Sequence, residues 1–362
     1  MKIPINIPII EKEEILAVTS VLKNGFLTSS AKNGGKKVQE FEKLASSFVN
    51  TKYAIAVNSG TAALQASLYA LDIKKGDEVL IPSFTFVATA NAVVSTGAKP
   101  VFVDILKENY TIDPDDIEKK ITNKTKAIIP VHLYGNIALI DQLSEISKKY
   151  NLKIIEDASQ SLGSTFRKKH TGTFFDLGCY SMYPAKVITS GEGGFIVTSN
   201  KKLREKLLMI RNHGMIYGYD TKIFGLNLRL PEINAALASI QIKKLPKFLQ
   251  IRKRNANLLS EFISDLKIEI PQQRKHENVN WYLYTINTLK RNKILQKLNQ
   301  KGIGATSYYP VPIHKTPYYK QKIKLPVTDW TASRVLSLPV HPKVTPKDIE
   351  FIAKSLREIL NE

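Results

Sequence analysis

A lysine that follows a short apolar run is the residue of this chain best suited to covalent chemistry. Lys186 lies in a loop between two strand-like runs, 177–182 and 195–198. Burial at such a position lowers the pKa of a lysine, and its neutral amine forms Schiff bases with carbonyl compounds, including pyridoxal phosphate (PLP). The alternative is that Lys186 is one more surface lysine of a lysine-rich chain.

Three further signals come before Lys186, at the ends of other strand-like runs. Ser59-Gly60-Thr61 forms a strand-to-helix turn, where a glycine lets the backbone approach a ligand and the free amides favour a phosphate. Phe86 follows the next run and has a face that can cover an aromatic ring. Asp157 ends the run 152–156 with a carboxylate that can pair with the protonated pyridine nitrogen of PLP.

Each of these signals also has an ordinary explanation. Serine and threonine cap helices, phenylalanine packs in cores, and aspartate caps helices or occupies turns. The order along the chain is more specific than any single signal, because a phosphate turn, an aromatic residue, an acid and a lysine follow one another at strand ends. This order predicts a PLP site.

The elements that would position these residues alternate from residue 54 onward. Strand-like runs are mostly joined by helical ones, which predicts an α/β fold with a mostly parallel seven-stranded sheet sandwiched by helices. Ligands of such sheets bind beyond the carboxyl ends of the strands. The predicted strands are 54–57, 78–81, 100–103, 127–131, 153–156, 177–182 and 195–198.

A proline in a long helical region sets the predicted domain boundary. We expect one helix over 232–245 and, after Pro246, another over 248–266. The chain would then divide into a large α/β domain, 1–245, and a smaller C-terminal α+β domain, 246–362. The small domain would contain a strand over 281–286 and helices over 293–301 and 346–360.

Composition narrows the class of protein. The 362 residues are 43% hydrophobic, which suffices for a large core, and no apolar run approaches the 20 residues of a membrane span. The N-terminus has no signal-peptide pattern. The single cysteine, Cys179, excludes intramolecular disulfides and a cysteine-based metal cage. We expect a cytoplasmic protein with no metal.

The formal net charge of +21 raises the possibility of a nucleic-acid partner. The lysines are scattered along the whole chain, however, and no nucleic-acid-binding motif accompanies them. We therefore do not expect nucleic acid as a partner. A positive field would also attract a doubly charged nucleotide substrate.

The sequence resembles the DegT/DnrJ/EryC1/StrS family of PLP-dependent sugar aminotransferases, within the fold-type I aminotransferases. The resemblance runs over nearly the whole chain. The segments that carry it are NSGTAAL (58–64), PSFTFVATANAV (82–93), PVFVDI (100–105), EDASQSLGS (156–164), YSMYPAKVITSGEGGFIVT (180–198), RNHG (211–214), GLNLRLPEINAALASIQIKKL (225–245), YYPVPIH (308–314) and LSLPVHP (336–342).

The resemblance implies two catalytic residues and two residues that hold the cofactor ring. Lys186 would bind PLP as a Schiff base and shuttle a proton between the cofactor and the substrate carbon. Asp157 would pair with the pyridinium nitrogen. Phe86 would stack on the ring, and Gln160 would lie near the phenolic oxygen.

The resemblance also implies how the phosphate and the substrate are held. The amides of Gly60 and Thr61 and the hydroxyl of Ser181 would bind the phosphate. Asn227 would reach the phosphate in the partner subunit, so each active site would require a homodimer. Three residues would lie near the sugar, namely Tyr183, Tyr309 and His314.

The implied function is transfer of an amino group from L-glutamate to a ketosugar linked to a nucleoside diphosphate. Tyr183-Pro184 and the YPVPIH loop resemble relatives that act at C3, whereas ITSGEGG resembles relatives that act at C4. One alternative is a non-nucleotide keto substrate, such as a cyclitol, a free ketose or an amino acid. Two others are a PLP-binding regulator of nucleic acid and a catalytically idle relative.

Overall fold

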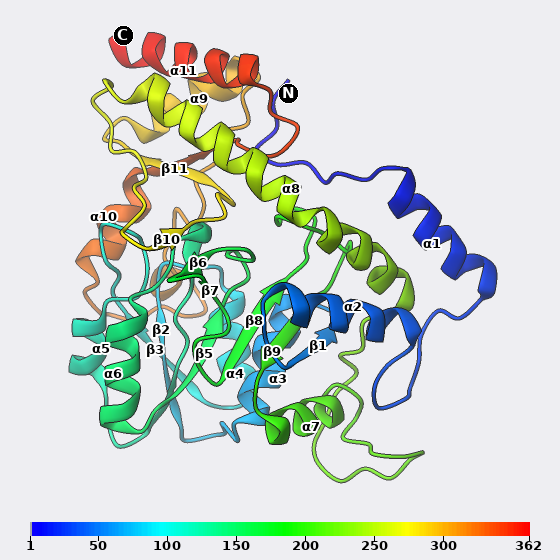
Figure 1. Ribbon diagram of the computed structural model, residues 1–362. Coiled ribbons are helices and arrows are strands. Elements are labelled where there is room, and N and C mark those ends of the chain that lie inside the picture. The colour runs from blue at the N-terminus through cyan, green and yellow to red at the C-terminus, as the bar shows by residue number, and fades with distance from the viewer. Residues whose placement is uncertain (1) are drawn as a thin grey trace.

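A seven-stranded sheet forms the centre of the computed structural model, which describes residues 2–362 (Figure 1). The strand order is β1-β9-β8-β5-β4-β2-β3. Neighbouring strands pair in parallel except around β9, which runs antiparallel to both β1 and β8. The strands are β1 (Tyr53–Val57), β2 (Glu78–Pro82), β3 (Lys99–Val103), β4 (Thr125–Ile128), β5 (Lys153–Asp157), β8 (Leu177–Ser181) and β9 (Gly194–Thr198). The predicted mostly parallel sheet of seven strands is confirmed.

Helices cover both faces of this sheet, because successive side chains of a strand point to opposite faces. Ile55 and Val57 of β1 pack in the cluster of α3, α4 and α7, whereas Ala54 and Ala56 pack in the cluster of α2 and α8. A further cluster joins α5 and α6 to the half of the sheet around β4. These helices are α2 (Lys36–Phe48), α3 (Gly60–Ala70), α4 (Ala88–Ser95), α5 (Pro114–Lys120), α6 (Ile140–Tyr150), α7 (Lys201–Ile210) and α8 (Glu232–Ile263).

Helix α8 corrects one expectation, since it runs unbroken through Pro246. A proline inside a helix removes one backbone hydrogen bond and costs roughly 3 kcal/mol. Here Ile242, Leu245 and Phe248 on either side of the proline are all buried in one cluster. Packing on both sides of the proline therefore outweighs the local penalty, and the two predicted helices are one.

The C-terminal part of the chain has a second core. It joins the far end of α8 to an antiparallel strand pair and two helices, and Ile3 from the N-terminal segment packs into it. A strand was expected over 281–286, but Trp281 has a left-handed φ of 51° and the strand begins at Tyr284. The remaining elements are α1 (Lys12–Asn24), η1 (Leu133–Gly135), β6 (Thr165–Phe166), β7 (Lys169–His170), β10 (Glu277–Asn278), β11 (Tyr284–Asn287), α9 (Arg291–Gln300), η2 (Ile313–Lys315), α10 (Pro326–Arg334), β12 (Val335–Leu338) and α11 (Pro346–Asn361).

The division into domains 1–245 and 246–362 stays a prediction. Helix α8 crosses the predicted boundary at residue 246, and Ile3 packs in the C-terminal core. Over residues 2–362, every helix is either too short or too polar to cross a membrane.

Helix α1 is attached to α8 through a lysine. The carboxylates of Glu11, Glu13 and Glu14 gather closely enough to hold a metal ion. The ammonium of Lys244 lies among them, at 2.8, 2.6 and 2.9 Å from the three side chains. The lysine therefore supplies the positive charge that this cluster requires.

Candidate active site

A cavity of about 660 Å³ opens where the carboxyl ends of β1, β5 and β8 meet. It is lined by all the predicted site residues except Asn227 and His314. Those that line it are Gly60, Thr61, Phe86, Asp157, Gln160, Ser181, Tyr183, Lys186 and Tyr309. Residues that are up to 249 positions apart in the sequence thus share one cavity, as expected for the strand ends of a parallel sheet.

The turn between β1 and α3 forms a cradle for an anion. The side chain of Ser59 accepts a hydrogen bond of 3.0 Å from the amide of Ala62, while the amides of Gly60 and Thr61 have no partner within the helix. A Cβ atom at Gly60 would lie 2.8 Å from the Cβ of Ser181. The glycine therefore lets the helix start and the serine hydroxyl approach the same point, which suits a phosphate.

Asp157 presents a carboxylate to the cavity at the end of β5. It is 5% exposed, and its Oδ2 accepts a hydrogen bond of 2.9 Å from the hydroxyl of Thr89. Its Oδ1 accepts a hydrogen bond of 3.2 Å from the amide of Ser159. Both oxygens thus accept hydrogen bonds from the protein, which holds the carboxylate in one orientation at the wall of the cavity.

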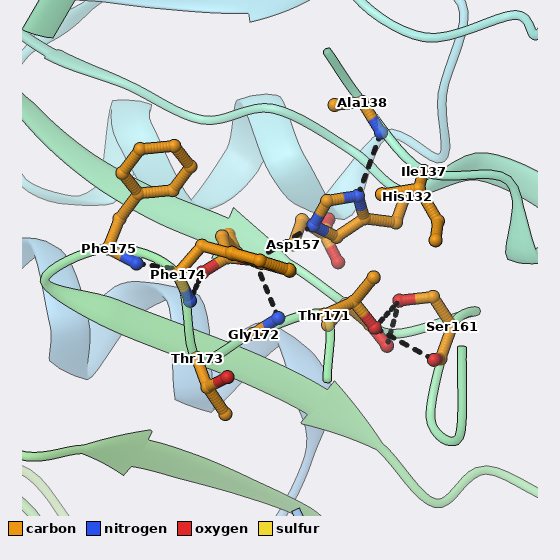
Figure 2. A network of polar contacts seen from close by, with 12 residues as sticks. His132, Ile137, Ala138, Asp157, Ser161, Thr171, Gly172, Thr173, Phe174 and Phe175 are labelled. Atoms are coloured by element: carbon orange, nitrogen blue, oxygen red, sulfur yellow. Dashed lines mark hydrogen bonds and ion pairs between the residues drawn. The ribbon is translucent and has the colours of Figure 1, made fainter. Parts of the chain in front are cut away.

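The preceding residue, Glu156, fixes the end of β5 from the other face of the strand. Its fully buried carboxylate accepts a hydrogen bond of 3.0 Å from His132 Nε2, and His132 Nδ1 accepts one from the amide of Ala138 (Figure 2). These two bonds place the ring proton of His132 on Nε2. Glu156 also accepts hydrogen bonds from three amides of the loop before β8, those of Gly172, Phe174 and Phe175. The network therefore joins the end of β5, next to Asp157, to the loop that precedes β8.

Lys186 lies in the loop that joins β8 to β9. Its amide donates to the carbonyl of Tyr183 at 2.8 Å, and its ammonium lies 5.0 Å from the ring centre of Tyr282. Burial lowers the pKa of Lys186 to about 8, and the negative charge of Asp157 opposes this shift. A substantial share of the amine is therefore neutral near pH 8, as a nucleophile requires.

The glycines that follow Lys186 allow β9 to enter the sheet. A Cβ atom at Gly194 would lie 2.6 Å from the backbone of Ser59 and from the carbonyl oxygen of Tyr180. Only glycine fits between the ends of β1 and β8 at this point. The GEGG turn therefore brings the phosphate cradle and the lysine loop side by side.

Gln160 and the aromatic residues form the remaining walls of the cavity. Gln160 Oε1 accepts from the amide of Tyr134 at 2.9 Å, and its Nε2 donates to the hydroxyl of Tyr309 at 3.0 Å. Phe86 and Tyr183 are 57% and 50% exposed, so they offer their faces to a ligand. Gln160, in contrast, has both ends of its amide engaged by the protein.

The two predicted residues outside the cavity lie in different settings. His314 is buried, and burial lowers its pKa. Its Nδ1 lies at hydrogen-bond distance, 2.7 Å, from the hydroxyl of Ser83, which accepts a hydrogen bond of 3.1 Å from the His314 amide. It therefore fastens the 308–314 loop to the end of β2, away from the cavity. Asn227 is exposed, and its carbonyl accepts from the side chain of Asn58 at 3.3 Å.

Other residues line the cavity that our reading of the sequence did not single out. They include Thr89, Ser159, Glu192, Tyr282 and Ser307. Thr89 stands one helical turn after Phe86, and this spacing could have identified it. Tyr282 carried no such signal, because it comes from the C-terminal part of the chain and reaches the site only through the tertiary fold.

The cavity fits PLP. Gly60 leaves space for a phosphate at a point where a Cβ atom would clash with Ser181. Asp157 offers a carboxylate with which the ring nitrogen could pair. Lys186 supplies an amine of lowered pKa in the same cavity.

The chain is similar to known proteins over nearly its whole length. The sequence model of the DegT/DnrJ/EryC1/StrS aminotransferase family matches residues 8–357. The chain is 35% identical to a UDP-N-acetyl-3-dehydro-α-D-glucosamine 3-aminotransferase of Acidithiobacillus ferrooxidans, over 90% of this chain and 89% of that protein. It is 35% identical to a dTDP-3-amino-3,4,6-trideoxy-α-D-glucose transaminase of Streptomyces venezuelae (96% and 93%). It is 32% identical to a GDP-perosamine synthase of Escherichia coli O157:H7 (99% of each).

Solved structures show the same fold. Streptomyces venezuelae DesV superposes with a TM-score of 0.93 at 34% identity, over 97% of this chain and 95% of that one. The PLP form of Spr1654 from Streptococcus pneumoniae, described as a sugar aminotransferase, superposes with a TM-score of 0.93 at 26% identity, over 100% and 99%.

Proposed function

We propose that this chain, which belongs to the DegT/DnrJ/EryC1/StrS aminotransferase family, moves an amino group from L-glutamate to a ketosugar linked to a nucleoside diphosphate. The enzyme is an aminotransferase and its cofactor is PLP. The observation that carries the proposal is the convergence of Lys186, Asp157 and the Gly60 cradle on one cavity. The amino donor, the acceptor and the roles of the individual residues are part of the proposal.

The residues divide the work by their chemistry. When bound, PLP supplies the electron sink for transamination. The Gly60 and Thr61 amides and the Ser181 hydroxyl would hold its phosphate, and Asp157 would keep its ring nitrogen protonated. Lys186 would hold the cofactor and move a proton at Nζ, a task that a pKa near 8 suits.

The acceptor is proposed from the relatives and from charge. The three relatives are named for UDP-, dTDP- and GDP-linked sugars, so they share a nucleotide-linked sugar but no single base. A net charge of +21 would draw a diphosphate towards the protein. The proposal covers amination at C3 or C4 of the sugar.

A two-step experiment tests this function. The absorbance of the purified protein with PLP is recorded before and after L-glutamate is added, and conversion to the pyridoxamine form is expected. UDP-, dTDP- and GDP-linked ketosugars and the matching free ketosugars are then supplied, and the amino product is followed by mass spectrometry. A spectrum that ignores glutamate would exclude that donor. If only the free ketosugars are converted, the proposed nucleotide-linked acceptor is wrong.

We also propose a cytoplasmic homodimer in which Asn227 completes the partner's site. Its exposed position on the chain is compatible with that role. Lys186→Ala and Asn227→Ala proteins would be mixed, unfolded and refolded together at limiting PLP. Mixed dimers would contain one intact site, so the mixture should recover up to about a quarter of the parent activity. No recovery, with dimers still forming, would contradict the shared site.

A further inference from the structure

The segment before α1 lies across the loop that carries Lys186. Figure 1 shows this N-terminal segment running beside α8 before α1 begins. The side-chain amide of Asn6 donates a hydrogen bond of 2.8 Å to the carbonyl of Ala185, the residue next to Lys186. Asn6 is thus in direct contact with the backbone that sets the position of the lysine.

Asn6 is itself held by a buried arginine of α8. Arg252 Nη2 donates a hydrogen bond of 3.0 Å to Asn6 Oδ1. On the other side, Arg252 Nη1 donates to the carbonyls of Trp281 and Tyr282 at 3.2 and 3.1 Å. The ring of Tyr282 is the one that lies under the Lys186 ammonium. One guanidinium therefore holds elements on two sides of Lys186.

The segment is fastened on either side of Asn6. The carbonyl of Pro4 accepts a hydrogen bond of 3.0 Å from His341 Nε2, and the carbonyl of Ile9 accepts one of 2.7 Å from Gln241. Asn6 therefore sits in a segment with fixed ends. We therefore expect a substitution at Asn6 to release the backbone at Ala185 without detaching the whole segment.

The surroundings of Arg252 are unusual for a buried cation. The residue is 2% exposed, and its partners among residues 2–362 are the oxygens of carbonyls and of one amide, with no carboxylate. Burial lowers its pKa to about 10. A cation buried without a counter-charge costs stability, and a long apolar side chain would fill the same space at less cost. Its planar fork, however, presents donors from separate nitrogens to these three oxygens in a fixed geometry, whereas the three donors of a lysine share one freely rotating nitrogen.

We infer that Arg252 is a positioning residue for Lys186, acting through Asn6 on the lysine loop and through the Tyr282 backbone on the ring beneath the amine. The inference rests on the proposed role of Lys186. It concerns how this chain places that amine and not which substrates it uses.

Chemical labelling of Lys186 in the protein without PLP tests the inference independently of turnover. Acetylation of Lys186 by acetic anhydride is measured by mass spectrometry from pH 6 to 11 in the parent protein and in two variants, Asn6→Ala and Arg252→Lys. The control is Arg254→Lys, the same substitution at an exposed position of α8, where the guanidinium donates hydrogen bonds to Oδ1 of the neighbouring Asn255. The melting temperature of each protein reports on folding.

We expect Asn6→Ala to let the loop relax and to expose the amine to water. The labelling midpoint should then rise from near pH 8 by about one unit, and labelling at pH 7 should fall about tenfold. In the PLP-loaded enzyme, kcat should fall severalfold while KM for both substrates stays within about twofold. Arg252→Lys should have at least as large an effect, because it also disturbs the bonds to the Trp281 and Tyr282 carbonyls. The double variant should be no worse than Arg252→Lys alone, because both changes break the connection between Arg252 and Asn6. Arg254→Lys should behave as the parent.

The inference is overturned if Lys186 in the Asn6→Ala protein is acetylated with the same pH dependence as in the parent protein. It is equally overturned if both variants lower the melting temperature but leave the Lys186 profile unchanged, because that result describes a merely structural arginine. Failure of the acceptor assay would leave the labelling result standing, so the two proposals fail separately.

Discussion

Gly60 and Ser181 face each other so closely that a Cβ atom on the glycine would lie 2.8 Å from the Cβ of the serine. This pair joins the start of α3 to the end of β8, and the space between them is where we place the phosphate. Gly60 does not have a left-handed φ, so the glycine is required by proximity and not by backbone conformation.

Gly60→Ala should therefore weaken PLP binding more than it weakens the fold. We expect the Kd for PLP to rise at least about tenfold, since the added methyl group narrows the phosphate cradle. Titration of the protein with PLP, followed by absorbance, measures this. Ser181→Ala is the comparison, because it removes the hydroxyl without adding bulk. An unchanged Kd for Gly60→Ala, at an unchanged melting temperature, would place the phosphate elsewhere.

Asp157→Asn should lower turnover while PLP stays bound. The amide keeps the shape of the carboxylate and its neighbours Thr89 and Ser159, but it cannot hold a proton on the ring nitrogen by charge. A fall in kcat of about 10²-fold is expected. Steady-state kinetics at saturating PLP test this, with the exposed Asp141→Asn as the control. Parent-like kinetics in Asp157→Asn would remove Asp157 from the mechanism.

Lys186→Ala should abolish the visible absorbance band of lysine-bound PLP and reduce turnover by about 10³-fold or more. The physical reason is that no other lysine lines the cavity among residues 2–362. Lys201→Ala, an exposed lysine at the start of α7, should leave both the spectrum and the rate unchanged. If Lys186→Ala still transaminates at the parent rate, the mechanism is wrong.

His341 should make the fold sensitive to acid. Burial lowers its pKa to about 4 from an ordinary value of 6.5, so the folded protein resists protonation of this ring. The unfolding free energy is therefore highest above pH 6.5 and decreases as the pH falls towards 4, because the unfolded protein binds a proton at this ring and the folded protein does not. Between pH 7 and 4.5 this single group should account for about 2 to 3 kcal/mol of the decrease in unfolding free energy.

Urea unfolding of His341→Gln at the two pH values measures this contribution. The variant should lose less stability on acidification than the parent, whatever its stability at pH 7. His276→Gln, at an exposed position, serves as the control and should lose as much as the parent. Equal losses in His341→Gln and in the parent would show that His341 is protonated without cost.

The amino-acid sequence predicted the sheet well, because each strand carries its own local signal. A strand such as β8 is buried on both faces, so it reads as a short apolar run bounded by turn residues. Gly60, Asp157 and Lys186 follow strands that the fold makes parallel. Knowing that these residues stand at carboxyl ends was therefore enough to predict that they would meet.

Local signals were misleading where packing decided the outcome. Pro246 is a helix breaker by its own chemistry, yet α8 continues through it because its neighbours are buried on both sides. His314 contacts Ser83 and is not among the residues that line the cavity, so its expected contact with the sugar stays a prediction.

The sequence by itself thus determined the sheet, the cradle glycine, the acid and the lysine, since each depends on neighbours within a few residues. Only the tertiary structure decided that Thr89 supports Asp157, that Tyr282 lies under Lys186, and that Arg252 reaches both sides of that lysine. These contacts join distant segments, and ordinary residue types make them. No local pattern distinguishes such residues, because their role arises from the positions that the folded chain gives them.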